Sequence, residues 1–233
     1  MRHSIPAEDS RVGYRRFHAR RHRQFLDLLA RHCPQSVARC LDIGGGGDAG
    51  GMAEEIRARF AHALHAVDLG VDVALGRARG VLAEECNIDR DALPYADGFF
   101  GLVLFASVIE HLYHPRHVMS EVARVLAPGG LLVVEAPNAV ALGRRLDALA
   151  GRNPFATFNR YNAVEDKGLM VECSVFYTPE EIVAMIASDF EVLECCYGMH
   201  TPPAHAVKRL VREVAFRLRP RLGDCFFVIA RRR

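Results

Sequence analysis

Between residues 37 and 137, short apolar segments alternate with segments of helical periodicity, and this alternation constrains the fold more than any other feature of the chain. Strands are expected at 37–43 and in HALHAVD, VLAEECN, FFGLVLFA and LLVVEAP. Helices are expected at Met52–Phe60, Val71–Arg79 and Pro115–Leu126, the last of them stopped by the turn APGG. Strands that alternate with helices predict βαβ units, and continuous apolar runs such as LVLFA are typical of strands buried on both faces. We therefore expect an α/β fold with a doubly wound, mostly parallel sheet and helices on both faces.

The segments outside this alternation frame the core at 37–137. Residues 1–36 form an N-terminal helical segment, with a helix expected at Tyr14–His32. Residues 138–177 are rich in Asn, Arg and aromatic residues, and connections of this length are often lids or substrate walls. We interpret this segment as a substrate-lid insertion.

Residues 178–233 complete the sheet. Thr178 is the expected N-cap of a helix, with Pro179 at its first position and Glu181 at its third. The strand FEVLECCYG, a helix at Ala204–Arg219 and the strand DCFFVIA follow. The sequence thus predicts one domain, 1–233, whose sheet has seven strands.

Composition agrees with a soluble globular domain. Half of the 233 residues are hydrophobic and a quarter are charged, which suits one domain with a sizeable core. The chain lacks both an apolar run of the roughly 20 residues that would cross a bilayer and the apolar stretch of a secretory signal. Seven cysteines without a C-x-x-C pair are typical of reduced thiols. These features predict a cytoplasmic protein.

Positive charge is concentrated at the two ends of the chain. Residues 1–33 hold eight arginines and three acidic residues, and residues 204–233 hold nine Lys or Arg and two acidic residues. This pattern favours peripheral contact with an anionic partner or surface, or alternatively a pair of solvated amphipathic helices. Nucleic acid is not expected, because the arginines are not interleaved with aromatic residues as in single-strand binders.

The stretch CLDIGGGGDAGG places four glycines directly after the first expected strand, with Asp42 two residues before the first glycine. A glycine turn at the carboxyl end of a parallel strand lets a ligand approach the backbone. Gly44, Gly46, Ala49 and Asp68 fit the G-x-G-x-x-G/A pattern of dinucleotide sites, which would indicate an NAD-dependent oxidoreductase. Asp42 would repel a pyrophosphate, however, and it suits the cationic amino group of S-adenosylmethionine better. Asp68 can accept ribose hydroxyls under either interpretation.

Four segments in succession resemble the class I S-adenosylmethionine-dependent methyltransferases. They are CLDIGGGG, AVDLG, NIDRDALPYADGFFGLVLFASVIEHL and EVARVLAPGGLLVVEAPN, and together they cover roughly residues 38–138. The later segments NAVALGRRLDALAGRNPF and FYTPEEI are similar to a branch that contains ubiquinone-biosynthesis-type and glycan-cluster methyltransferases. The resemblance implies a Rossmann-like methyltransferase sheet with S-adenosylmethionine as the cofactor.

The resemblance also implies roles for the residues of the first two motifs. Asp42, Gly44 and Gly46 correspond to the turn that holds the methionine end of the cofactor. Asp68 corresponds to the residue that binds the ribose, and Leu69 lies beside the adenine.

The later motifs supply the remaining contacts that the resemblance implies. Asn87 matches an acidic family position at the adenine amino group, with Asp89 as the competing choice, and the Ile88 amide faces the ring. Phe105, expected to end the fourth strand, offers its carbonyl to the methionine amino group. Two positions depart from the family pattern, because Asp48 stands where a third glycine is usual and Gly101 replaces a frequent Asp.

His111, in VIEHL just after the fourth strand, is the candidate catalytic base, since a hydroxyl acceptor would benefit from a base within hydrogen-bond reach. The alternative is that His111 caps the following turn or packs structurally, and Glu110 is expected to be structural. His111, His114 and His117 form H-x-x-H-x-x-H, but Pro115 interrupts a common helical face, so no metal site is expected.

Several other residues are candidates to line an acceptor pocket, or else to lie in the core or at the surface: Tyr161, His200, His205 and the aromatic residues Phe155, Phe158 and Tyr177. The function that the sequence favours is methyl transfer, first to an oxygen, of a small-molecule, glycan-like or lipid-linked acceptor. The alternatives are the NAD-dependent oxidoreductase and a methyltransferase-like binding protein that has lost catalysis.

Overall fold

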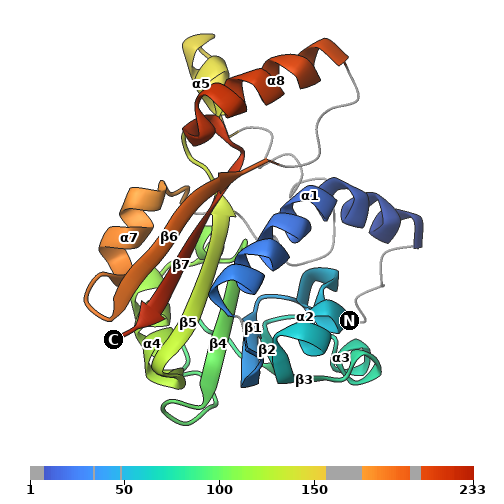
Figure 1. The fold of residues 1–233 in the computed structure, drawn as a ribbon, viewed down its shortest axis with the longest axis vertical. Coiled ribbons are helices and arrows are strands. Elements are labelled where there is room, and N and C mark those ends of the chain that lie inside the picture. Colours follow the sequence, from blue (N-terminus) through green and yellow to red (C-terminus); the bar gives the residue numbers. More distant parts are fainter. Residues whose placement is uncertain (1–7, 34, 48, 156–174, 200–205) are drawn as a thin grey trace.

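The computed structural model describes residues 8–33, 35–47, 49–155, 175–199 and 206–233. Within these ranges, seven strands form one sheet in the order β3-β2-β1-β4-β5-β7-β6 (Figure 1). The strands are β1 (Val37–Ile43), β2 (Ala61–Asp68), β3 (Val81–Glu85), β4 (Phe100–Ala106), β5 (Leu126–Pro137), β6 (Phe190–Gly198) and β7 (Cys225–Arg232). Only β7 runs antiparallel to its neighbours, β5 and β6. The predicted doubly wound, mostly parallel sheet is confirmed.

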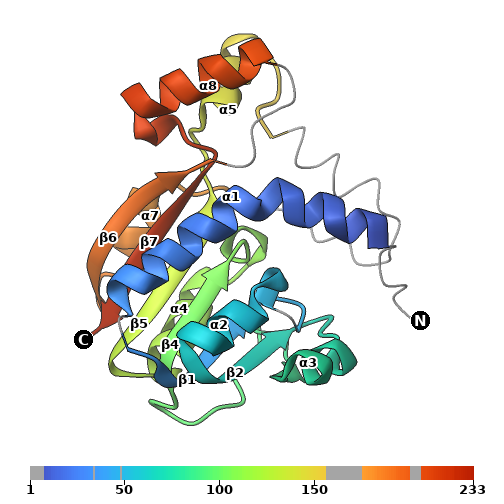
Figure 2. The same ribbon diagram turned by 45° about the vertical axis from the view of Figure 1, so that its right-hand side comes forward.

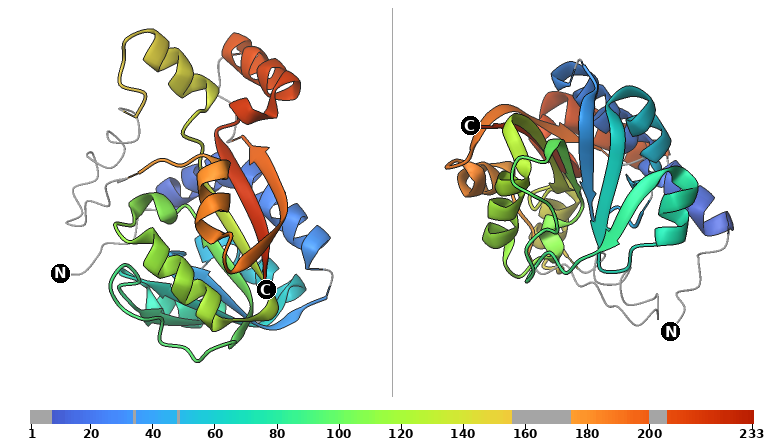
Figure 3. Two further views of the ribbon diagram at one scale, coloured as in Figure 1. Left: turned by 90° about the vertical axis from the view of Figure 1, so that its left-hand side faces the viewer. Right: turned by 90° about the horizontal axis from the view of Figure 1, so that it is seen from below.

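Helices cover both faces of this sheet. The described α-helices are α1 (Glu8–His32), α2 (Ala53–Arg59), α3 (Val73–Arg79), α4 (Pro115–Val125), α5 (Leu142–Leu149), α7 (Pro179–Ile186) and α8 (Ala206–Leu218). Short 3₁₀ helices are η1 (Ala49–Gly51), η2 (Ile109–His111) and η3 (Pro220–Leu222). In Figure 2, α1 runs across one face of the sheet, and in Figure 3 α4 and α7 lie on the opposite face. Two helices, α5 and α8, project beyond the carboxyl end of β5 (Figures 1 and 2).

The core divides into two clusters because successive strand residues point to opposite faces. Leu41 and Ile43 pack with α4 and α7, whereas Cys40 packs with the α1 residues Phe25 and Leu28. Gly101, the departure from the family pattern in β4, has a packing reason. A Cβ atom there would lie 2.9 Å from the Cβ of Val37, so β1 and β4 can approach only with glycine at this position.

Several predicted boundaries need correction. Among the described residues the first helix spans Glu8–His32, so it begins before the predicted start at Tyr14. The segment APGG does not form a separate turn, because β5 begins at Leu126 and includes it. The pairing of β4 with β5 shifts register between Phe100 and Leu102, so β5 contains an irregularity there. The α7 start is confirmed, with Thr178 and Glu181 forming a capping box.

The two ends of the insertion at 138–177 lie side by side. Asn138 and Tyr177 form an isolated parallel bridge, and the Ala139 amide donates to the Tyr177 carbonyl at 3.0 Å. Tyr177 is buried in the core, and Phe155 stacks on Phe176 with a ring separation of 4.4 Å. For Tyr177 the core interpretation therefore holds.

Candidate functional site

The predicted cofactor residues come together where the parallel strands end. Ile43 of β1 pairs with Val67 of β2 and with Phe105 of β4, and Ala106 pairs with Glu135 of β5. The carboxyl ends of these four strands therefore form one edge. Ligands of doubly wound sheets bind at such an edge, beside the point where strand order reverses, which here lies between β1 and β4.

Asp42 and the glycine turn form one unit at this edge. The Asp42 side chain is buried, with the residue 5% exposed. A Cβ atom on Gly45 would lie only 1.4 Å from Asp42 Oδ2, so the carboxylate rests directly against the turn and only glycine fits there. Gly44 and Gly46 were predicted from the motif, whereas the role of Gly45 was not. The signal that could have found it was the unbroken run of glycines two residues after an acid.

The two predicted glycines have the backbone geometry that the turn requires. Gly44 and Gly46 have φ angles of +78° and +64°, which lie in the left-handed region that favours glycine. The Gly44 amide donates to the Val67 carbonyl at 2.8 Å, which anchors the turn to β2. Apart from the chain neighbours of Gly46, no atom of the described residues lies within 4 Å of a Cβ placed there, so its backbone faces open space that a ligand can enter.

Asp68 ends β2 and is linked to the same turn. Its Oδ2 accepts from the Gly46 amide at 3.1 Å, and its Oδ1 accepts from the Leu69 amide at 2.7 Å. Each carboxylate oxygen can accept a further hydrogen bond, so the side chain can still bind ribose hydroxyls. Leu69 is 47% exposed, which leaves its apolar side chain available to an adenine ring.

Asn87 and Asp89 are the two candidates for the contact with the adenine amino group. Asp89 accepts from the amides of Tyr113 and His114, at 3.0 and 2.7 Å, and so holds the segment that precedes α4. Asn87 is half-buried and Ile88 is buried. Asp68 also accepts from two amides, so these hydrogen bonds do not exclude Asp89, and Asn87 stays the proposed contact on the family resemblance.

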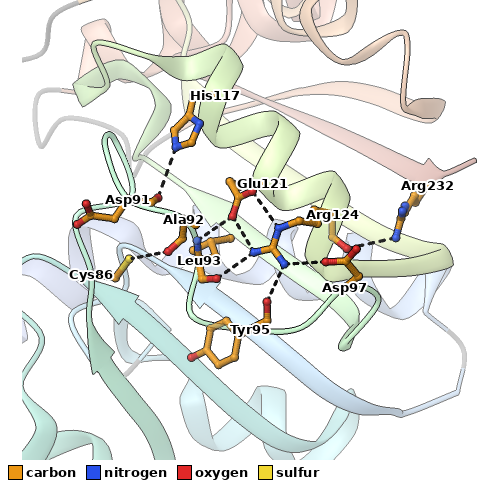
Figure 4. Close-up of polar contacts among 10 residues, drawn as sticks. All are labelled: Cys86, Asp91, Ala92, Leu93, Tyr95, Asp97, His117, Glu121, Arg124 and Arg232. Atoms are coloured by element: carbon orange, nitrogen blue, oxygen red, sulfur yellow. Dashed lines mark hydrogen bonds and ion pairs between the residues drawn. The ribbon is translucent and has the colours of Figure 1, made fainter.

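A network centred on Arg124 of α4 fixes the loop that follows Asn87 and Ile88 (Figure 4). The guanidinium donates to the carbonyls of Leu93 and Tyr95, at 2.9 and 2.7 Å. Glu121 accepts from Arg124 and from the Leu93 amide, and these bonds lower its pKa. This network was not predicted from the sequence, and it connects the expected adenine side of the site to α4.

Phe105 is not the last residue of its strand. β4 continues to Ala106, and the Phe105 side chain is fully buried. The following residue, Ser107, has a φ of +56°, and the chain turns there toward η2. Val108 then packs on the glycine turn, because its Cγ2 would lie 2.3 Å from a Cβ on Gly44. The segment that carries His111 is thereby held beside the expected cofactor site.

Two carboxyl groups are buried in this region, one in η2 and one in β5. Glu110 and Glu135 are each 1% exposed, and Ser107 Oγ donates to Glu135 Oε2 at 2.8 Å. Arg21 of α1, also buried, donates to Ser107 Oγ at 2.7 Å and lies 3.3 Å from Glu135. The alternative of solvated N-terminal arginines is therefore wrong for Arg21, because its side chain is buried and forms an ion pair with Glu135.

Burial raises the pKa of Glu110 to about 8, and the nearby negative charge of Glu135 adds to the increase. Glu110 Oε2 has no hydrogen-bond partner among the described residues. A neutral carboxylic acid is cheaper to bury than a carboxylate, so Glu110 retains its proton at neutral pH.

The raised pKa makes stability depend on pH in a defined direction. The unfolded chain loses the Glu110 proton near its ordinary pKa of 4.5, whereas the folded chain holds it up to about 8. The folded state therefore binds more protons between these values, and stability falls as pH rises from 5 to 8. We expect Glu110→Gln to lessen this fall by about 2–3 kcal/mol, measured by urea unfolding of both proteins at several pH values. If both proteins lost stability equally as the pH rises, Glu110 would have an ordinary pKa in the folded state.

His111 ends η2 with its side chain 25% exposed, and its Nε2 lies 4.0 Å from Glu110 Oε1. Asp89 accepts hydrogen bonds from the amides of Tyr113 and His114 in the turn before α4, and His114 occupies the N-cap position of that helix. The partial exposure of the His111 side chain suits contact with an acceptor, and its role as the base stays a prediction.

The neighbouring histidines point elsewhere. His114 lies 3.5 Å from Asp89, and His117 contacts the Asp91 carbonyl at 3.4 Å. Among the residues that the structure describes, no group of three or more His, Cys, Asp or Glu is arranged to hold a metal ion. Asp48, Phe158, Tyr161, His200 and His205 lie outside the described residues.

Comparisons with known proteins were made on sequence and on structure. A family model described as a methyltransferase domain matches residues 14–194. A "Probable S-adenosylmethionine-dependent methyltransferase" of Mycobacterium tuberculosis is 31% identical over 169 residues, covering 69% of this chain and 59% of that protein. A ubiquinone biosynthesis O-methyltransferase of Xylella fastidiosa is 30% identical over 120 residues, covering 48% of this chain and 47% of its own. The chain thus spans about half of these curated relatives' length.

A similar fold occurs in the N-methyltransferase NodS of Bradyrhizobium japonicum, solved with S-adenosyl-L-homocysteine. The TM-score is 0.59 at 16% identity, and the match covers 93% of this chain and 87% of that one. At this identity the likeness concerns the fold alone.

Proposed function

Because the chain belongs to the class I S-adenosylmethionine-dependent methyltransferase family, we propose that it transfers the methyl group of this cofactor to an oxygen atom of an acceptor. The acceptor class that we propose is a small molecule or a glycan-like or lipid-linked group. The observation that carries the proposal is the Asp42 carboxylate held against the backbone of Gly45, with open space over Gly46.

This arrangement supports binding of a cationic ligand tail at the turn. The buried Asp42 carboxylate attracts an amino group, and the absence of side chains at the turn lets that group reach the backbone. The remaining contacts with the cofactor are those that the family resemblance implies. They come from the Phe105 carbonyl, Asp68, Leu69, Asn87 and the Ile88 amide. When bound here, S-adenosylmethionine supplies a methyl group activated by its sulfonium centre.

The chain's own contribution to the reaction is alignment and proton removal. Val108, packed on Gly44, fixes the start of the segment that ends in His111. We propose that the His111 imidazole accepts the hydroxyl proton of the acceptor as the methyl group is transferred. The similarity to the ubiquinone biosynthesis O-methyltransferase of Xylella fastidiosa supports an oxygen acceptor.

Calorimetry tests the cofactor assignment without knowledge of the acceptor. We expect S-adenosylmethionine and S-adenosylhomocysteine to bind with one site per chain, and NAD to give no saturable heat. Saturable binding of NAD in their place would overturn the proposal.

Replacing Asp68 with alanine should weaken the binding of S-adenosylhomocysteine by about 1–3 kcal/mol, because a charge-assisted hydrogen-bond acceptor is lost. Asp72→Ala is the matched control, since Asp72 caps α3 by accepting from the Leu75 amide at 2.7 Å. The control should cost about 1 kcal/mol of stability but leave the affinity unchanged. Equal affinities of the unchanged protein and the two variants would exclude Asp68 from the site.

A further inference from the structure

Helix α8 carries its apolar residues on the face that points away from the molecule. The side chains of Val207, Leu210, Val211, Val214 and Leu218 are between 46% and 78% exposed. Their spacing of i, i+3, i+4, i+7 and i+11 places them on one side of the helix. A surface helix of a soluble protein normally buries such a stripe against the core.

The opposite face of α8 is the one that attaches to the body of the protein. Arg212 pairs with Asp224, and Glu213 pairs with Arg20 of α1. Phe216 packs near Gly223, where a Cβ atom would lie 2.9 Å from the Phe216 ring. The polar contacts fix the orientation of the helix, so the outward direction of the apolar stripe follows from the fold.

The charge around the stripe is positive. Arg209, Arg217 and Arg219 are exposed on α8 or directly after it. Both acidic residues of 206–233, Glu213 and Asp224, are engaged in ion pairs with arginines. A second copy of the chain would therefore bring like charges together, whereas an anionic lipid surface complements both the stripe and the arginines.

We propose that the outward face of α8 docks on an anionic bilayer surface, with the apolar stripe in the acyl boundary and the arginines at the headgroups. In α5, Leu146 and Leu149 are also exposed, and that helix projects at the same end of the molecule (Figures 1 and 2). Among the described residues no helix is long and apolar enough to span a membrane, so this contact is peripheral. Docking would turn the carboxyl edge of the sheet toward the lipid surface.

Vesicle sedimentation with the full chain tests this proposal. We expect binding to phosphatidylcholine vesicles that contain phosphatidylglycerol, and at least tenfold weaker binding to vesicles of phosphatidylcholine alone or at high salt. The double variant Leu210→Gln/Val214→Gln should lose at least tenfold in partitioning. Leu82→Gln, a matched change of another exposed apolar residue, should bind as the unchanged protein does.

Calorimetry with S-adenosylhomocysteine separates this proposal from the proposed function, because the α8 variants should retain full affinity for it. Absence of phosphatidylglycerol-dependent binding, or equal binding by the double variant, would overturn the docking proposal. A dimer in sedimentation velocity that the double variant abolishes would assign the stripe to self-association and would equally overturn it.

Discussion

Replacing His111 with alanine is expected to slow methyl transfer by about a hundredfold or more, because removal of a general base from a hydroxyl acceptor typically costs this much. The affinity for S-adenosylhomocysteine should stay nearly unchanged, since the cofactor contacts come from the glycine turn, Asp68 and the Asn87 loop. The measurement is product formation with the first acceptor identified on a panel of phenols, sugars and lipid-linked compounds. Calorimetry on the same preparation confirms that the site is intact.

His114→Ala is the control for this experiment. His114 lies three residues further on, its side chain is 64% exposed, and it contacts Asp89 rather than the carboxyl edge. We expect its loss to change turnover little. If His111→Ala also retained full turnover, His111 would be a structural residue and the protein would act by positioning alone.

The second large effect is expected at Gly45. Alanine at this position must displace the Asp42 carboxylate, since the added carbon would lie 1.4 Å from Oδ2. The lost charge-assisted bond and the overpacking each cost about 1–3 kcal/mol, so we expect cofactor binding to weaken by about thirtyfold or more. Calorimetry measures this loss, and urea unfolding shows how much of the cost falls on stability.

Gly143→Ala provides the comparison. Gly143 is exposed in α5 and no atom lies within 4 Å of a Cβ placed there, so alanine should be neutral or slightly stabilising. Normal cofactor affinity in Gly45→Ala would mean that Asp42 does not hold the ligand, and the central argument for the site would fail.

The sheet could be predicted from the sequence because its signals are local. Alternating apolar runs and helical periodicity mark the strands, and capping residues such as Thr178 mark a helix start. The continuation of β5 through APGG was not predictable in this way. Proline and glycine normally end a strand, and here pairing with β4 across an irregular register extends it.

The parts of the site that escaped prediction depend on contacts between distant segments. Arg21 lies 86 residues from Ser107 and 114 from Glu135, so its buried role cannot be read from an arginine-rich helix. The Arg124 network likewise links α4 to a loop about 30 residues earlier. Asp42, Gly44 and Gly46 could be proposed because they follow one another in one motif, and Asp68 because it ends the next expected strand.

The pairing of Asn138 with Tyr177 has a consequence for how the length of the insertion can vary. The chain departs from the sheet at Asn138 and returns beside it at Tyr177, joined by a backbone hydrogen bond. Replacement of the intervening stretch by one of different length would leave the strand order intact, since lengthening a loop between fixed ends adds little entropy cost. Segments of different length can therefore be joined between these two residues without disturbing the carboxyl edge of the sheet.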